Sequence, residues 1–85
     1  MIRVQFEKNK AVAYDEEKII GECEFIESND TWNIIHTGVD NSYQGQGIAK
    51  RLVECVILAS KELNKNVIAD CSYAKKVIEK TKEGL

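Results

Sequence analysis

One stretch of the chain constrains the fold more than any other, because it places a long amphipathic helix between two segments of strand character. The helix is predicted over Gln46–Asn64, and its apolar side chains recur at steps of three and four residues: Ile48, Leu52, Val56, Ala59 and Leu63. Trp32–Val39 precedes this helix and Asn66–Cys71 follows it, and both segments are predicted as strands. Such a β-α-β unit has parallel strands and a right-handed crossover.

The rest of the chain predicts three earlier strands and one later helix. The segments that alternate polar with apolar residues, or run apolar between polar turns, are Ile2–Phe6, Ala11–Tyr14 and Ile19–Ile26. Helical spacing of apolar residues returns over Tyr73–Lys80. We therefore expect an α+β fold with a mixed, mostly antiparallel five-stranded sheet and a C-terminal β-α-β-α unit. With 85 residues there is volume for one core, so residues 1–85 are expected to form a single domain.

Composition excludes several classes of function. The net charge of -2 and the pI near 5.4 argue against a nucleic-acid surface, which needs clustered Lys and Arg. No apolar run is long enough to span a bilayer, and the first residues do not resemble a signal peptide. We therefore expect a cytoplasmic protein without membrane or nucleic-acid partners. It is expected to be a monomer or a weak dimer, because the edge strands of the sheet are open to pairing.

The three cysteines predict neither a disulfide framework nor a metal site. Cys23, Cys55 and Cys71 are odd in number, widely spaced and contain no Cys-x-x-Cys pair. Reduced thiols and no bound metal are expected.

A short glycine motif lies where the predicted loop Asp40–Gln46 enters the long helix. Its sequence is Gln-Gly-Gln-Gly-Ile-Ala over Gln44–Ala49. The first turn of a helix presents unpaired backbone N–H groups and the positive end of the helix dipole, and glycines let an anion approach without a Cβ in the way. Two glycines in a polar loop are on their own more often a simple turn. The position between a strand and a helix favours a diphosphate site.

The same motif resembles the signature of the GNAT acetyltransferase superfamily, which is Gln or Arg, two residues, Gly, one residue, then Gly or Ala. The His36-Thr37-x-Val39 step and the Cys71-Ser72-Tyr73 step also look like those of the small single-domain GNAT-like proteins, and the similarity extends over about Trp32–Lys80. The resemblance implies a minimal GNAT-like fold that binds acetyl-CoA. It also implies transfer of the acetyl group to an amine, in a small molecule or a protein lysine, that the sequence does not identify.

The resemblance also implies a set of site residues. Those expected to bind the cofactor are Gly38, Val39, Gln44, Gly45, Gln46, Gly47, Ile48, Ala49, Lys50, Cys71, Ser72 and Lys76. The catalytic candidates are Cys71, His36 and Tyr73. Cys71, just before a helix, either accepts the acetyl group transiently or lines the pocket. His36 is either a base or a structural histidine, and Tyr73 either protonates the leaving thiolate or forms a wall of the cleft.

The sequence leaves two other functions open. Many of the small relatives carry an acidic residue where this chain has Gly38, and Cys-Pro-Phe where it has Cys71-Ser72-Tyr73. The first difference removes a candidate general base, which favours a CoA-binding or acyl-sensing module with little catalysis. A third hypothesis is that the chain is an interaction domain in which the glycine motif is only a turn.

Overall fold

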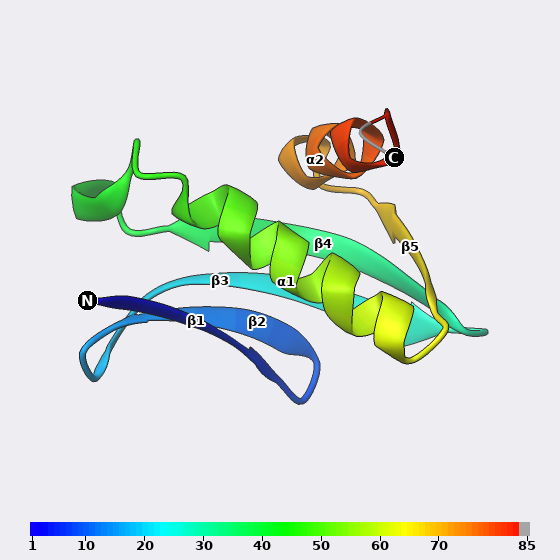
Figure 1. The fold of residues 1–85 in the computed structure, drawn as a ribbon, viewed down its shortest axis with the longest axis horizontal. Helices are drawn as coiled ribbons and strands as arrows, with labels where there is room; N and C mark the ends of the chain where they lie inside the picture. The colour runs from blue at the N-terminus through cyan, green and yellow to red at the C-terminus, as the bar shows by residue number, and fades with distance from the viewer. Residues whose placement is uncertain (84–85) are drawn as a thin grey trace.

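The computed structural model describes residues 1–83, and it contains the five strands and two helices that the sequence predicts (Figure 1). In chain order the elements are β1 (Ile2–Glu7), β2 (Lys10–Asp15), β3 (Lys18–Ser28), β4 (Thr31–Val39), the one-turn 3-10 helix η1 (Asn41–Tyr43), α1 (Ile48–Glu62), β5 (Asn66–Ala69) and α2 (Ser72–Glu83). The α+β class is therefore confirmed. The turn η1, inside the predicted loop, is the one element that the sequence did not indicate.

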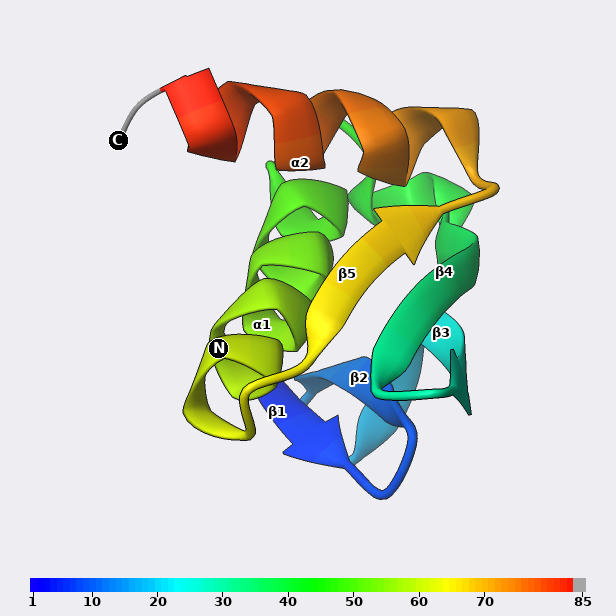
Figure 2. The same ribbon diagram turned by 90° about the vertical axis from the view of Figure 1, so that its right-hand side faces the viewer.

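The sheet has the order β1-β2-β3-β4-β5. The first three pairings are antiparallel and the pairing of β4 with β5 is parallel, as the predicted β-α-β unit requires. The turn from β3 to β4 holds Asn29 and Asp30 with φ of 51° and 62°, left-handed values that hairpin turns need and that these residue types tolerate. Helix α1 lies along one face of the sheet, and α2 lies beside the β5 edge (Figures 1 and 2).

The hydrophobic core lies between α1 and the sheet. The buried residues of α1 are Ile48, Leu52, Val53, Val56, Ile57 and Ser60. Leu63 was predicted to belong to this face, and that prediction is wrong, because the helix ends at Glu62 and the side chain of Leu63 is 55% exposed. Opposite the helix, Trp32 is buried and its ring stacks on that of Phe25, with 4.2 Å between the ring centroids.

Among the element boundaries that differ from the prediction, three have an identifiable reason. Helix α1 begins at Ile48 rather than at residue 46, because the backbone at Gly47 is left-handed, with φ of 76°. It ends before Asn64, whose φ of 57° is the left-handed stop expected there. Strand β5 ends at Ala69 rather than at residue 71. The N–H groups of residues 70 and 71 both donate to the carbonyl of Ile34, at 3.0 and 3.3 Å, so the regular ladder stops.

A bulge in β4 separates the two parallel strands. Ile34 pairs with Phe25 and His36 pairs with Glu24, which leaves Ile35 as the extra residue. Strand β5 pairs only with the part of β4 before this bulge, whereas β4 continues along β3 to its end. The two parallel strands therefore part beyond Ile34, and the second half of β4 has a free edge on that side.

Candidate functional site

A cleft of about 580 Å³ lies between the end of β4 and the start of α1, where β4 and β5 have parted. Its lining residues are Thr37, Gly38, Val39, Tyr43, Gln44, Gly45, Gly47, Ile48, Ala49 and Tyr73. Ligands of sheets with parallel strands gather at this place, outside the carboxyl ends of the strands. The cleft thus brings together the glycine motif, the end of β4 and the first turn of α2.

The loop that enters α1 is fixed at its first residues. The N–H of Asp40 donates to the carbonyl of Ile20 at 2.7 Å, and the carboxylate of Asp40 accepts the N–H of Ser42 at 2.9 Å. The hydroxyl of Tyr43 donates to the carboxylate of Asp15 in the β2–β3 hairpin, which lowers the pKa of Asp15 and raises that of Tyr43. The chain is therefore held as far as Tyr43, and the glycine turn begins from a fixed point.

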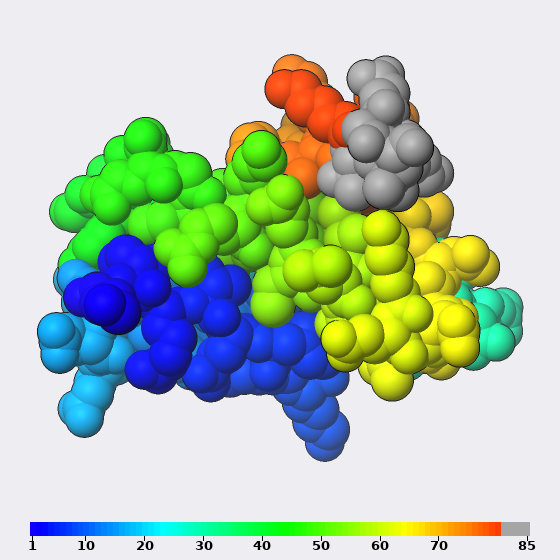
Figure 3. All heavy atoms as spheres, in the orientation of Figure 1, coloured from blue at the N-terminus to red at the C-terminus, as the bar shows by residue number. Residues whose placement is uncertain are grey.

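The two glycines of the turn are exposed, and their backbone conformation requires glycine. Their φ values are 84° at Gly45 and 76° at Gly47, and a Cβ at either position would meet no heavy atom within 4 Å. The turn is therefore not crowded by the rest of the protein, and glycine is favoured there by backbone strain. In the space-filling view this segment forms the projecting edge at the upper left (Figure 3, green).

The backbone N–H groups of this turn have no acceptor in the described part of the chain. The first N–H bonded into α1 is that of Arg51, which donates to the carbonyl of Gly47 at 3.2 Å. The N–H of Gln44 donates to Asn41 at 3.4 Å, but those of residues 45–50 reach no acceptor within residues 1–83. No acidic side chain lies in the first turn of α1. Free N–H groups at the positive end of a helix form a site for an anion.

Cys71 lies next to the cleft as the N-cap residue of α2. Its carbonyl accepts the N–H of Lys75 at 3.0 Å, which is the first hydrogen bond of that helix. Burial tends to raise the pKa of the Cys71 thiol, but hydrogen bonds from the backbone N–H groups of Ala74, Tyr73 and Thr37 outweigh it, so the pKa is lowered. Because Thr37 lines the cleft, the Cys71 thiol with its lowered pKa lies behind the cleft wall that Thr37 forms.

The other two cysteines have the opposite character. Cys23 is buried in the core, and burial raises its pKa to about 11, although the Thr37 hydroxyl donates to its Sγ at 3.5 Å. Burial also raises the pKa of Cys55 in α1. All three cysteines are free thiols.

These opposite pKa shifts predict a selective modification. In a pulse of iodoacetamide, Cys71 is expected to react first, with a pH midpoint below the ordinary thiol range, because only its thiolate is stabilised. Cys23 and Cys55 are expected to stay unmodified until the chain unfolds. Peptide mass spectrometry after pulses at a series of pH values measures this. The chain unfolded in urea is the control, and a folded Cys71 that titrates as in urea would contradict the prediction.

The bulge in β4 decides which side chains reach the cleft. Because Ile35 and His36 both lie opposite Glu24, the next residue Thr37 faces Cys23 in the core, and His36 lies exposed on the sheet face away from α1. The ring of His36 covers Gly38, where a Cβ would lie 2.9 Å from Nε2. The structure therefore does not bring His36 together with Cys71, and its role as a base stays a prediction.

The remaining predicted residues divide between the cleft and its surroundings. Gln46 and Ser72 are exposed and do not line the cleft, and Lys50 and Lys76 line a neighbouring hollow between the helices. Two cleft residues were not predicted as site residues, Thr37 and Tyr43. Nothing near Tyr43 in the sequence indicates its bond to the hairpin. Thr37 belongs to the step His36-Thr37-x-Val39, which was the available signal.

The described residues, 1–83, contain neither a metal cluster nor a membrane-spanning helix. In that part of the chain no three His, Cys, Asp or Glu side chains come together as metal ligands. No helix there combines the length and the apolar character needed to cross a bilayer.

Comparison with known proteins gives matches by sequence family and by structure. A family model described as GCN5-related N-acetyl-transferase matches residues 5–84. No curated protein matches the chain. The NMR structure of a GCN5-like protein from Staphylococcus aureus is 34% identical, with a TM-score of 0.72, and the match covers 95% of this chain and 81% of that one.

Two further similar structures are those of larger proteins with coenzyme A bound. A GNAT family N-acetyltransferase from Escherichia coli in complex with CoA is 28% identical over 71% of this chain and 38% of that chain, with a TM-score of 0.65. The PaiA N-acetyltransferase from Thermoplasma acidophilum in complex with coenzyme A is 16% identical over 66% of this chain and 35% of that chain, with a TM-score of 0.62. At that identity the second match shows the fold alone.

Proposed function

Because this chain belongs to the GCN5-related N-acetyltransferase family, we propose that it binds acetyl-CoA and transfers the acetyl group to an amine acceptor. One observation carries the proposal. Backbone N–H groups of residues 45–50 have no acceptor within residues 1–83, and Gly45, Gly47, Ile48 and Ala49 of this segment line an open cleft where a diphosphate can bind. The presence of CoA in the structure of the similar Escherichia coli protein supports the same choice of cofactor.

The geometry suggests how the cofactor lies. Its diphosphate binds the N–H groups at the start of α1, and its pantetheine arm follows the second half of β4 from Val39 toward Thr37. That half of β4 has no strand partner on the β5 side within the described part of the chain. Its backbone can therefore form hydrogen bonds with the amide groups of the pantetheine arm. The thioester then reaches the neighbourhood of Cys71.

Acetyl transfer requires a nucleophile at the thioester carbon and a proton for the departing CoA thiolate. We propose that the thiolate of Cys71 attacks that carbon, so that a new C–S bond forms as the bond to CoA breaks. The lowered pKa of Cys71 supports this step. The hydroxyl of Tyr73, a cleft residue, supplies the proton to the leaving thiolate. An unprotonated amine then attacks the acetyl-cysteine and loses a proton to the Tyr73 phenolate, which restores the Tyr73 hydroxyl as the Cys71 thiolate is released.

A second candidate function has an observation of its own. The residues that line the cleft include no carboxylate and no imidazole, and His36 faces the other side of the sheet. A general base for the acceptor amine is therefore missing from the cleft walls. This favours the alternative of a CoA-binding or acyl-sensing module with little turnover.

Turnover distinguishes the two functions. Incubation with acetyl-CoA and a panel of amines is expected to release free CoA, and mass spectrometry before the amine is added is expected to find one acetyl group on Cys71. The Cys71→Ala variant should lose that acetyl group and slow CoA release by roughly a hundredfold or more. Binding of acetyl-CoA without release across the panel would establish the sensing module instead.

A further inference from the structure

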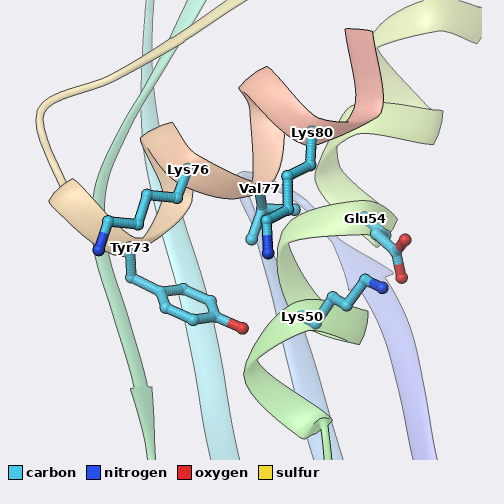
Figure 4. A pocket seen from close by; sticks show the side chains of 6 residues that line it. All are labelled: Lys50, Glu54, Tyr73, Lys76, Val77 and Lys80. Carbon is cyan, nitrogen blue, oxygen red and sulfur yellow. The ribbon is translucent and has the colours of Figure 1, made fainter. Parts of the chain in front are cut away.

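A second hollow lies between the two helices beside the cleft. It has a volume of about 290 Å³, and its lining residues are Lys50 and Glu54 from α1 and Tyr73, Lys76, Val77 and Lys80 from α2 (Figure 4). Tyr73 also lines the cleft, so the two spaces meet at its side chain. We call this hollow the lysine groove.

The lysine groove concentrates positive charge that the protein does not neutralise. It holds three ammonium groups and the single carboxylate of Glu54, in a chain whose net charge is -2. The lysine ion pairs of the described residues involve Lys10 and Lys65, so none of the groove lysines is paired. Because no carboxylate of the described residues lies within ion-pairing distance of these lysines, the groove suits an anion from outside.

Lysines from both helices line the groove. Lys76 and Lys80 are four residues apart and therefore share a face of α2, where like charges repel each other unless an anion lies between them. Figure 4 shows the side chains of Tyr73 and Lys80 extending from α2 toward the first turns of α1, where Lys50 lies. Lys50 is also the last residue of the segment with free N–H groups, which places the groove next to the diphosphate position.

We propose that the lysine groove binds the phosphomonoester on the ribose of coenzyme A, and that the protein thereby selects coenzyme A over its dephosphorylated form. This inference rests on the proposed function. The diphosphate and the phosphomonoester of CoA are attached to the same ribose, so a diphosphate on residues 45–50 brings the second phosphate near Lys50. A phosphomonoester carries nearly two negative charges at neutral pH, and lysine is a common partner for it.

The test compares CoA with dephospho-CoA by isothermal titration calorimetry at low ionic strength. The wild-type protein is expected to bind CoA roughly tenfold more tightly or better, because only CoA gains charge-assisted contacts in the groove. A double Lys76→Gln and Lys80→Gln variant should bind CoA about as weakly as dephospho-CoA, with its affinity for dephospho-CoA unchanged. Lys75→Gln, on the same helix but outside the groove, is the matched control.

The outcomes separate this inference from the proposed function. Equal affinity of the wild type for the two compounds overturns the groove proposal and leaves acetyl-CoA binding intact. An equal loss of affinity for CoA and for dephospho-CoA in the double variant also overturns it, because the lysines then act only through the overall charge of the protein. If neither compound binds the wild type, the proposed function and the groove proposal fail together. Because both lysines are exposed, the double variant is expected to fold as the wild type does, and circular dichroism checks this.

Discussion

Replacing Gly47 with valine is expected to weaken acetyl-CoA binding by roughly a hundredfold or more, equivalent to about 3 kcal/mol of binding free energy. At φ of 76° a β-branched side chain is strained, so the turn shifts and the free N–H groups of residues 45–50 no longer point at one anion. The fold itself should survive with a loss of about 1–2 kcal/mol, because a Cβ at this position meets no neighbouring atom. Calorimetric titration measures the affinity.

Gln46→Ala is the matched control for this variant. Gln46 lies in the same exposed turn, its φ is not left-handed, and alanine keeps its backbone N–H. The control should bind acetyl-CoA within about threefold of the wild type, as expected of an exposed substitution that keeps the backbone. Wild-type affinity in Gly47→Val would show that the conformation of the turn does not hold the cofactor.

Replacing Trp32 with alanine is expected to lower the free energy of unfolding by about 3–5 kcal/mol, a large part of the total that domains usually have. The side chain of Trp32 is 3% exposed, and its ring centroid lies 4.2 Å from that of Phe25 and 5.6 Å from that of Phe6. Alanine removes this stack and leaves a cavity between α1 and the sheet. Urea unfolding followed by circular dichroism measures the change, since the variant has no tryptophan left to fluoresce.

Trp32→Phe separates stacking from the rest of the side chain. The indole N–H of Trp32 is buried without a hydrogen-bond partner in the described residues, so phenylalanine removes a costly group while keeping an aromatic ring in place. We expect a loss below about 1.5 kcal/mol for this variant. An alanine variant as stable as the phenylalanine variant would contradict the assignment of Trp32 to the centre of the core.

The order of elements could be predicted because each has a local signal. The spacing of Leu52 and Val56 gives the period of α1, and the polar turn around Asn29 and the helix stop at Asn64 depend on residues that tolerate positive φ. The parallel pairing of β4 with β5 followed from the length of the crossover between them. Local periods and turn residues therefore determined the architecture.

The facing of side chains in the site could not be predicted in the same way. Strict alternation from Ile34 would place His36 toward α1, whereas the bulge at Ile35 turns Thr37 inward and leaves His36 outside. No residue type marks that bulge in the sequence. The bond from Tyr43 to Asp15 joins residues far apart in the chain, so it depends on the finished sheet. The glycine motif was found because its signal is local.

The most direct test of the account is a titration of the isotope-labelled protein with acetyl-CoA, followed through its backbone amide resonances. The account predicts large shifts that saturate together for residues 45–50, whose N–H groups have no acceptor among residues 1–83, with smaller ones along the second half of β4. Resonances of the β1–β2 hairpin should not move. Unchanged amides at residues 45–50 in the presence of saturating acetyl-CoA would contradict the central claim that the start of α1 holds the diphosphate.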